Sequence, residues 1–183
     1  IELLSGKREI NEVYFADDRL IDKPTLPDDK SCAAAAEVFN QIASYAKGKI
    51  YTLFLPTAAY IQSDKLPEYA PKEDQSAIIS RLQARLSGNI TVLDAITPLT
   101  SVKNSRIYYN TDPKITGYGA FTVYNYNMKS MGFQPATLNE FNIEYGTCDF
   151  YGELYDRTSY SKVSPDRVEL YHYNTQNFPV KVF

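Results

Sequence analysis

Strand-like and helix-like patterns alternate through the middle of the chain, and this alternation restricts the possible folds more than any other feature of the sequence. Three largely apolar runs are typical of strands, at residues 49–55, 90–96 and 106–109. Three segments carry apolar side chains at helical spacing, at residues 28–47, 74–86 and 117–131. Such a repeat predicts an α/β fold, a three-layer sandwich in which helices cover a mainly parallel sheet.

Local signals mark where these elements begin and end. Asp29 or Ser31 is expected to cap the first helix, and Gly48 to end it. The apolar stripe expected on this helix comprises Ala35, Val38, Phe39, Ile42, Ala43 and Ala46. Thr116 is expected to cap the last helix. The run at 49–55 is largely apolar, which predicts a strand buried on both faces.

The two ends of the chain follow other patterns. Residues 12–22 contain two short β-prone runs on either side of residues 16–18, which predicts a hairpin. After Pro135 the chain is rich in tyrosine, and we expect irregular loops and edge strands there. Without an internal repeat or a low-complexity linker, one domain is expected. Its parts would be a hairpin and loop at 1–28, an α/β core at 29–135 and a tyrosine-rich tail at 136–183.

Composition argues against several classes of function. The chain has 183 residues and a formal net charge of −3, so it lacks the basic surface of a nucleic-acid-binding protein. No apolar run approaches the roughly 20 residues that span a membrane. Cys32 and Cys148 are expected to be free or buried thiols, and with one histidine they are too few for a zinc site. The "GYG" at 117–119 lacks the rest of a dinucleotide fingerprint, so no cofactor is expected.

Two loops are candidates for a functional site. In parallel α/β sheets, functional residues gather in loops that leave the carboxyl ends of strands. One such loop follows the run at 49–55 and contains Tyr60, and the other follows the run at 106–109 and contains Asp112. Both loops are expected on the same edge of the sheet, so Tyr60 and Asp112 are expected to face one cleft.

The second loop also carries a family resemblance. The stretch "YYNTDPKITGYGAFTVYNYNMKSMGF" at 108–133 resembles the motif region of the DHHW protein family, which is named for an Asp-His-His-Trp run between a strand and a helix. Asp112, Thr116, Gly119 and Ala120 occupy the family's positions. The similarity extends to four further blocks, "GKREINEVYFADDRLID", "LFLPTAAYIQSDKLPEYAPKEDQ", "DFYGELYDRTSY" and "SPDRVELYHY".

The resemblance implies an SGNH-like or flavodoxin-like sheet and a relation to SGNH hydrolases and alginate O-acetyltransferases of the cell envelope. In those enzymes an Asp-x-His unit activates a serine elsewhere in the chain. Asp112 would be the orienting acid, but Pro113 and Lys114 occupy the histidine positions and Ile115 the tryptophan position. The family's serine block is expected after the end of this chain, so the fold is expected to be incomplete at its C-terminus.

Asp112 also has a structural interpretation. An aspartate before a proline can close an Asx-turn, and a strand-to-helix turn needs such a residue whether or not chemistry occurs there. His172, the only histidine in the chain, is the remaining candidate for a base paired with Asp112. A lone histidine among tyrosines is more typical of a surface or edge-strand position.

Three functional hypotheses remain from the sequence. In the first, the chain is a catalytically degenerate DHHW-family protein of the cell envelope or extracellular space, and a cleft binds a cell-wall or exopolysaccharide glycan. Residues suited to contact sugars in that cleft are Tyr60, Tyr109, Lys114, Thr116 and Tyr118. In the second, Asp112 and His172 serve an acyl esterase or O-acetyltransferase. In the third, the chain is a structural or partner-binding module with the tyrosine-rich tail as its interface.

Overall fold

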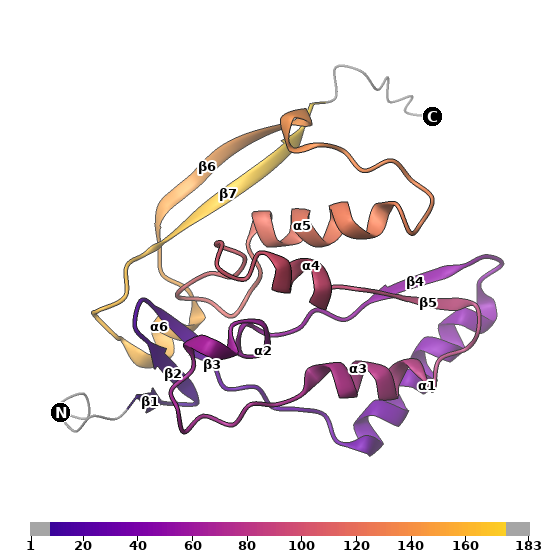
Figure 1. Ribbon diagram of the computed structural model, residues 1–183, viewed down its shortest axis with the longest axis horizontal. Helices are drawn as coiled ribbons and strands as arrows, with labels where there is room; N and C mark the ends of the chain where they lie inside the picture. Colours follow the sequence, from indigo (N-terminus) through magenta and orange to yellow (C-terminus); the bar gives the residue numbers. More distant parts are fainter. Residues whose placement is uncertain (1–7, 175–183) are drawn as a thin grey trace.

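The computed structural model of the protein describes residues 8–174, and their strands form three separate small sheets joined by helices (Figure 1). The fold is therefore mixed α/β. One sheet has three strands in the order β1-β2-β3, and the other two are the pairs β4-β5 and β6-β7. Only β4 and β5 run parallel. The described residues therefore do not form the mainly parallel sheet that the strand–helix alternation predicted.

The predicted N-terminal hairpin is confirmed. Strands β2 (Val13–Ala16) and β3 (Arg19–Asp22) pair antiparallel, and β1 (Glu9–Ile10) adds a short third strand. All four residues of β2 are buried, because the hairpin packs on both faces. Alternate residues such as Val13 and Phe15 contact the region of Leu154, whereas Tyr14 and Ala16 contact that of Ala59.

The parallel pair consists of β4 (Ile50–Leu53) and β5 (Ile90–Leu93). The expectation that β4 would be buried on both faces is wrong, since only Thr52 of its four residues is buried. The run at 106–109 does not extend this sheet. Its backbone pairs with the following turn instead, through a bridge between Tyr108 and Ile115. Two hydrogen bonds accompany this bridge, from the Tyr109 amide to the Lys114 carbonyl at 3.2 Å and from the Thr116 amide to the Ile107 carbonyl at 2.9 Å.

Two helices pack against each other, α1 (Asp29–Tyr45) and α3 (Gln75–Gln83). The cap of α1 is Asp28, which accepts a hydrogen bond from the Ser31 amide at 2.8 Å, so the prediction of Asp29 or Ser31 as the cap was wrong. The buried face of α1 comprises Cys32, Ala36 and Ala43. Two members of the predicted stripe are more than half exposed, Val38 at 56% and Ile42 at 57%.

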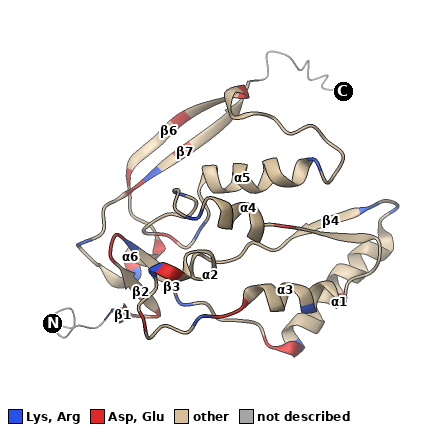
Figure 2. Ribbon diagram, viewed as in Figure 1, with Lys and Arg blue, Asp and Glu red and all other residues tan. Residues whose placement is uncertain are grey.

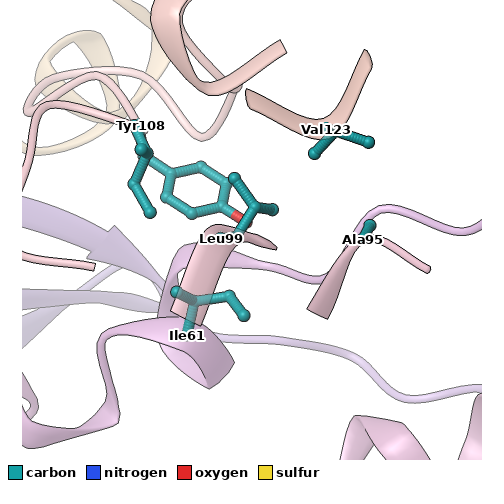
Figure 3. Close-up of a cluster of buried hydrophobic side chains, with 6 residues drawn as sticks. Ile61, Ala95, Leu99, Tyr108 and Val123 are labelled. Carbon is teal, nitrogen blue, oxygen red and sulfur yellow. The ribbon is translucent and has the colours of Figure 1, made fainter. Parts of the chain in front are cut away.

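The largest core cluster lies where three helices meet, α2 (Ala58–Ile61), α4 (Ile96–Ser101) and α5 (Gly117–Met128). A short 3-10 helix, η2 (Ser63–Lys65), follows α2. The cluster consists of Ile61, Ala95, Leu99, Ile107, Tyr108 and Val123 (Figure 3). This cluster fixes the turn that leads from Tyr108 into α5, and that turn carries Asp112.

The tyrosine-rich tail is more regular than expected. After the 3-10 helix η3 (Leu138–Glu140), strands β6 (Phe141–Phe150) and β7 (Asp166–Tyr173) form a long antiparallel hairpin with α6 (Glu153–Thr158) between them. Figure 1 shows this hairpin arching over α5. Both cysteine thiols are free, as predicted, with Cys32 buried and Cys148 exposed on β6. Across residues 8–174 no helix has the length and apolar character that crossing a membrane requires.

Candidate functional site

Asp112 lies buried in the turn between Tyr108 and α5, and its carboxylate is fully engaged in local contacts. Oδ1 accepts hydrogen bonds from the Lys114 amide and the Lys114 ammonium, both at 3.0 Å. Oδ2 accepts one from the Glu153 amide at 3.2 Å and another from the Lys114 ammonium at 3.3 Å. The bond to the amide two residues ahead is that of the Asx-turn considered above. Thr116, as predicted, caps α5 by accepting a hydrogen bond from the Gly119 amide at 3.1 Å.

The same turn also binds the first turn of α6. The Thr111 hydroxyl oxygen accepts a hydrogen bond from the Gly152 amide at 3.0 Å. The Thr111 carbonyl accepts bonds from the amides of Leu154 and Tyr155 at 2.9 and 3.2 Å. Together with the Asp112 bond to Glu153, these contacts satisfy amides that have no partner within a helix's first turn. The Asp112 loop is therefore the cap of α6.

Asp166, which the sequence analysis did not single out, holds this loop from the opposite side. It is completely buried, and its carboxylate accepts three hydrogen bonds. The donors are the amides of Asn110 (2.9 Å) and Thr111 (2.7 Å) and the Thr111 hydroxyl (2.7 Å). The available signal was its position in "SPDRVELYHY", one of the blocks that carry the family resemblance.

Arg19 joins the N-terminal hairpin to the same loop. Its buried guanidinium donates to Gln62 Oε1 and to Asn110 Oδ1, the latter at 2.7 Å. Burial lowers the pKa of Arg19, an effect that the nearby carboxylates of Asp18 and Asp166 partly offset. The arginine therefore holds the loop in place without access to solvent.

Lys114 extends outward from Asp112. Its side chain is 68% exposed, and its ammonium also lies 3.9 Å from a Glu153 carboxylate oxygen. The hydrogen bond from the ammonium to Asp112 raises the pKa of Lys114. The amine is therefore protonated near neutral pH, and a protonated amine cannot take a proton from a hydroxyl nucleophile.

The structure does not bring His172 to Asp112. His172 lies near the far end of β7, where its Nε2 is 3.7 Å from Glu144 Oε2 on β6. The residue of β7 that reaches the Asp112 loop is Asp166, six positions earlier in the chain. At the rise of an extended strand, six residues span about 20 Å.

The five predicted sugar-contacting residues do not line one cleft. Tyr60 and Tyr118 pack against the core cluster, and Thr116 is buried as the helix cap. Tyr109 packs edge-on against Phe150 at 5.7 Å, and burial raises its pKa. Lys114 is the member of the set that is mostly exposed. The cavity beside Asp112 has a volume of about 40 Å³, too small for a sugar ring.

The described part of the chain contains no candidate metal-binding site. Within residues 8–174, no group of three or more His, Cys, Asp or Glu side chains is arranged to hold a metal ion. The arrangement around Asp112 is instead a hydrogen-bonded junction of the hairpin, the turn before α5, and α6. The exposed functional group at this junction is the Lys114 ammonium, which lies beside the carboxylates of Asp112 and Glu153.

Comparison with known proteins gives a family match over nearly the whole chain. The family model described as "DHHW protein" matches residues 6–181. A DHHW family protein from Eubacterium siraeum has a similar structure, with a TM-score of 0.69 at 20% identity, covering 87% of this chain and 56% of that one. No curated protein matches the sequence.

Two solved structures with other descriptions share the fold. One is PatB1 of Bacillus cereus with a sulfonyl adduct, with a TM-score of 0.67 at 15% identity, covering 90% of this chain and 57% of that one. The other is the O-acetyltransferase domain of Pseudomonas putida AlgJ, with a TM-score of 0.65 at 15% identity, covering 86% of this chain and 63% of that one. The present chain thus spans less than two thirds of each of these structures.

Proposed function

The chain belongs to the DHHW protein family, and we propose that it is a cell-envelope member in which the Asp112 region supports the fold and a glycan contact instead of transferring an acyl group. The main support is one distance. The Lys114 ammonium lies 3.0 Å from Asp112 Oδ1 and belongs to the residue that replaces a family histidine. An imidazole in that position could exchange protons near neutral pH, whereas this ammonium stays charged.

The surroundings of Asp112 support the same interpretation. An orienting aspartate in an acyl-transfer triad keeps an oxygen for the imidazole N–H. Here the three donors are two amides and an ammonium, from Lys114 and Glu153. Asp112 therefore accepts a hydrogen bond that caps α6 and holds the charged Lys114 ammonium in place.

The exposed ammonium of Lys114 suits a glycan with acidic substituents, and the half-buried ring of neighbouring Tyr109 adds an apolar surface. We expect fragments of cell-wall or exopolysaccharide glycan to bind with a Kd of about 0.1 mM or tighter, which corresponds to about 5 kcal/mol. Isothermal titration calorimetry should show weaker binding for Lys114→Ala and for Tyr109→Ala. Lys47→Ala, which removes another exposed lysine, is the control. If none of the glycans binds, the ligand part of this proposal is wrong.

The rival function is an acyl esterase or O-acetyltransferase, favoured by the likeness to the AlgJ O-acetyltransferase domain. Hydrolysis of p-nitrophenyl acetate by the purified protein and by Asp112→Asn separates the two. The asparagine keeps one acceptor oxygen for the turn, and circular dichroism checks the fold. We expect equal rates, because Asp112 does not act on the substrate. A fall of more than about tenfold in the variant would establish the enzyme instead, since loss of an orienting aspartate costs a triad far more than that.

A further inference from the structure

A groove of about 910 Å³ lies between α5 and the β6–β7 hairpin, on a part of the molecule that the proposed function does not use. Aromatic side chains from three elements line it, namely Phe121, Tyr124, Phe141, Tyr171 and Tyr173. None of residues 109–116 contributes to its lining, so the groove is separate from the Asp112 and Lys114 site. Its volume lies in the range of small-molecule sites, roughly 300–1,000 Å³.

The aromatic rings support one another. Phe121 and Tyr171 lie 6.4 Å apart with nearly parallel planes, at 19°. Phe141 meets Phe121 edge-on at 5.6 Å and Tyr173 at 5.3 Å. Rings held by such contacts lose little further freedom when a ligand binds, because their orientations are already fixed.

Acidic groups set the electrostatic character of the groove. The described residues that line it include Glu140 and Glu169 but no lysine or arginine. Along α5 itself there is no charged residue at all (Figure 2). Glu169 is partly neutralised by Arg167, whose guanidinium lies 3.2 Å away. His172 also lines the groove, and its Nε2 lies 3.7 Å from Glu144 Oε2. The lining carboxylate without an ion pair among residues 8–174 is that of Glu140, and its negative charge attracts a cation.

Glu140 is the carboxylate best placed to bind that cation. Hydrogen bonds from the amide and hydroxyl of Thr137 fix its Oε2 and lower its pKa, so it stays ionised in mildly acidic solution. Its Oε1 accepts one hydrogen bond, from the Tyr173 hydroxyl at 3.2 Å, and a carboxylate oxygen can accept two. Within residues 8–174, Glu140 takes part in no ion pair.

We propose that this groove binds a saccharide bearing protonated amino groups, such as a glucosamine oligomer. A cation is attracted to the faces of aromatic rings, and a carboxylate beside them can accept its hydrogen bonds. The apolar face of a sugar ring suits the flat surfaces of Phe121 and Tyr171. A simple alkylammonium ion carries the same positive charge and N–H donors but has no sugar ring. Comparing its affinity with that of the saccharide shows whether the sugar ring contributes to binding.

The test is calorimetry on the full chain at about pH 5.5, where amine and Glu140 are both charged. The ligands are a glucosamine tetramer, its fully N-acetylated form and ethylammonium. We expect the amine tetramer to bind at least about tenfold more tightly than either of the others. Glu140→Gln should weaken that binding about tenfold, whereas Glu37→Gln, a matched change at an exposed residue of α1 outside the groove, should leave it unchanged.

A second variant guards against misfolding of the first. Phe121→Leu keeps an apolar side chain but removes a ring face, and should weaken the amine tetramer severalfold while urea unfolding stays cooperative. Equal affinity for the amine and acetylated tetramers, or wild-type binding by Glu140→Gln, would overturn the proposal. Ethylammonium binding as tightly as the tetramer would overturn the assignment to a saccharide. Lys114→Ala should not affect this binding, so failure here leaves the proposed function untouched.

Discussion

Gly152 allows α6 to approach Asp112 as closely as it does. An added Cβ at this position would collide with the Cβ of Asp112 and lie 2.6 Å from its Oδ2. The absence of a side chain lets the Gly152 amide reach Thr111 and the next amide reach Asp112. The glycine is thus a requirement of the junction that caps α6.

Gly152→Ala should therefore destabilise the protein by about 1–3 kcal/mol, since the crowded backbone must shift. The matched control is Gly88→Ala, because a Cβ there meets nothing within 4 Å. The control should change the free energy of unfolding by less than about 1 kcal/mol. Urea unfolding followed by circular dichroism measures both. Equal stabilities for the two variants would show that the contact with Asp112 relaxes without cost.

Residue-level prediction from the sequence worked where the partner is close in the chain. Thr116 was identified as a cap because its partner, Gly119, is three residues away. The Asx-turn of Asp112 is local in the same sense. Asp166 could not be found in this way, since its partner Thr111 lies 55 positions earlier. Nothing in the local pattern of either segment specifies that pairing.

At the scale of elements, helices were predictable and strand partners were not. The caps and apolar spacing of α1 and α3 lie within the helices or next to them, so only details such as Asp28 as the cap differed. Strand pairing instead depends on which segment lies alongside. The run at 106–109 pairs with its own turn. The β6–β7 hairpin encloses α6, so no short turn signal marked it.

The cap of α3 gives an element-level prediction about pH. Hydrogen bonds from the Ser76 hydroxyl and the amides of Ala77 and Ser76 lower the pKa of Asp74 below its usual 3.8. The unfolded chain then takes up a proton at higher pH than the folded protein does. The stabilising effect of this carboxylate is therefore present above about pH 4 and lost as pH falls through the folded-state pKa.

Asp74→Asn should keep the cap but remove this titration, because asparagine is an equally good N-cap residue without an acidic group. Urea unfolding at pH 7 and pH 3 should show a smaller loss of stability in the variant than in the wild-type protein. Asp149→Asn, at an exposed position in β6, is the control. A variant that loses as much stability as the wild type would contradict the assignment of acid sensitivity to this cap.

On the scale of the whole molecule, one buried side chain connects regions distant in sequence. Arg19 on β3 donates hydrogen bonds to Gln62, which directly follows α2, and to Asn110, which directly precedes Thr111 and Asp112 in the chain. Arg19→Lys keeps the charge but loses the planar fork that serves both partners. We expect it to lower the free energy of unfolding by about 2 kcal/mol. Arg81→Lys, at an exposed arginine, should change it by less than about 0.5 kcal/mol. Similar effects in urea unfolding would refute this role of Arg19.

The global arrangement was the hardest feature to predict. Alternating strand and helix patterns predicted α1, β4, α3, β5 and α5 but not the short helices α2 and α4. The number of strands in a sheet depends on which edges meet in space. Here the run at 106–109 forms a bridge with Ile115 and does not join the parallel sheet, which in the described residues comprises β4 and β5. Long-range packing also decided the surroundings of Tyr60 and Tyr118, two of the predicted sugar-contacting residues, which lie partly buried against the core cluster.

The two thiols of the chain differ completely in exposure, with Cys32 buried in α1 and Cys148 exposed on β6. A maleimide dye added to the folded protein should therefore modify Cys148 on β6 and leave Cys32 in α1 unmodified. A fluorophore at Cys148 would report on the strand whose first residue, Phe141, lines the aromatic groove. The natural sequence thus offers an attachment point for surface tethering or single-molecule optics without any engineered cysteine.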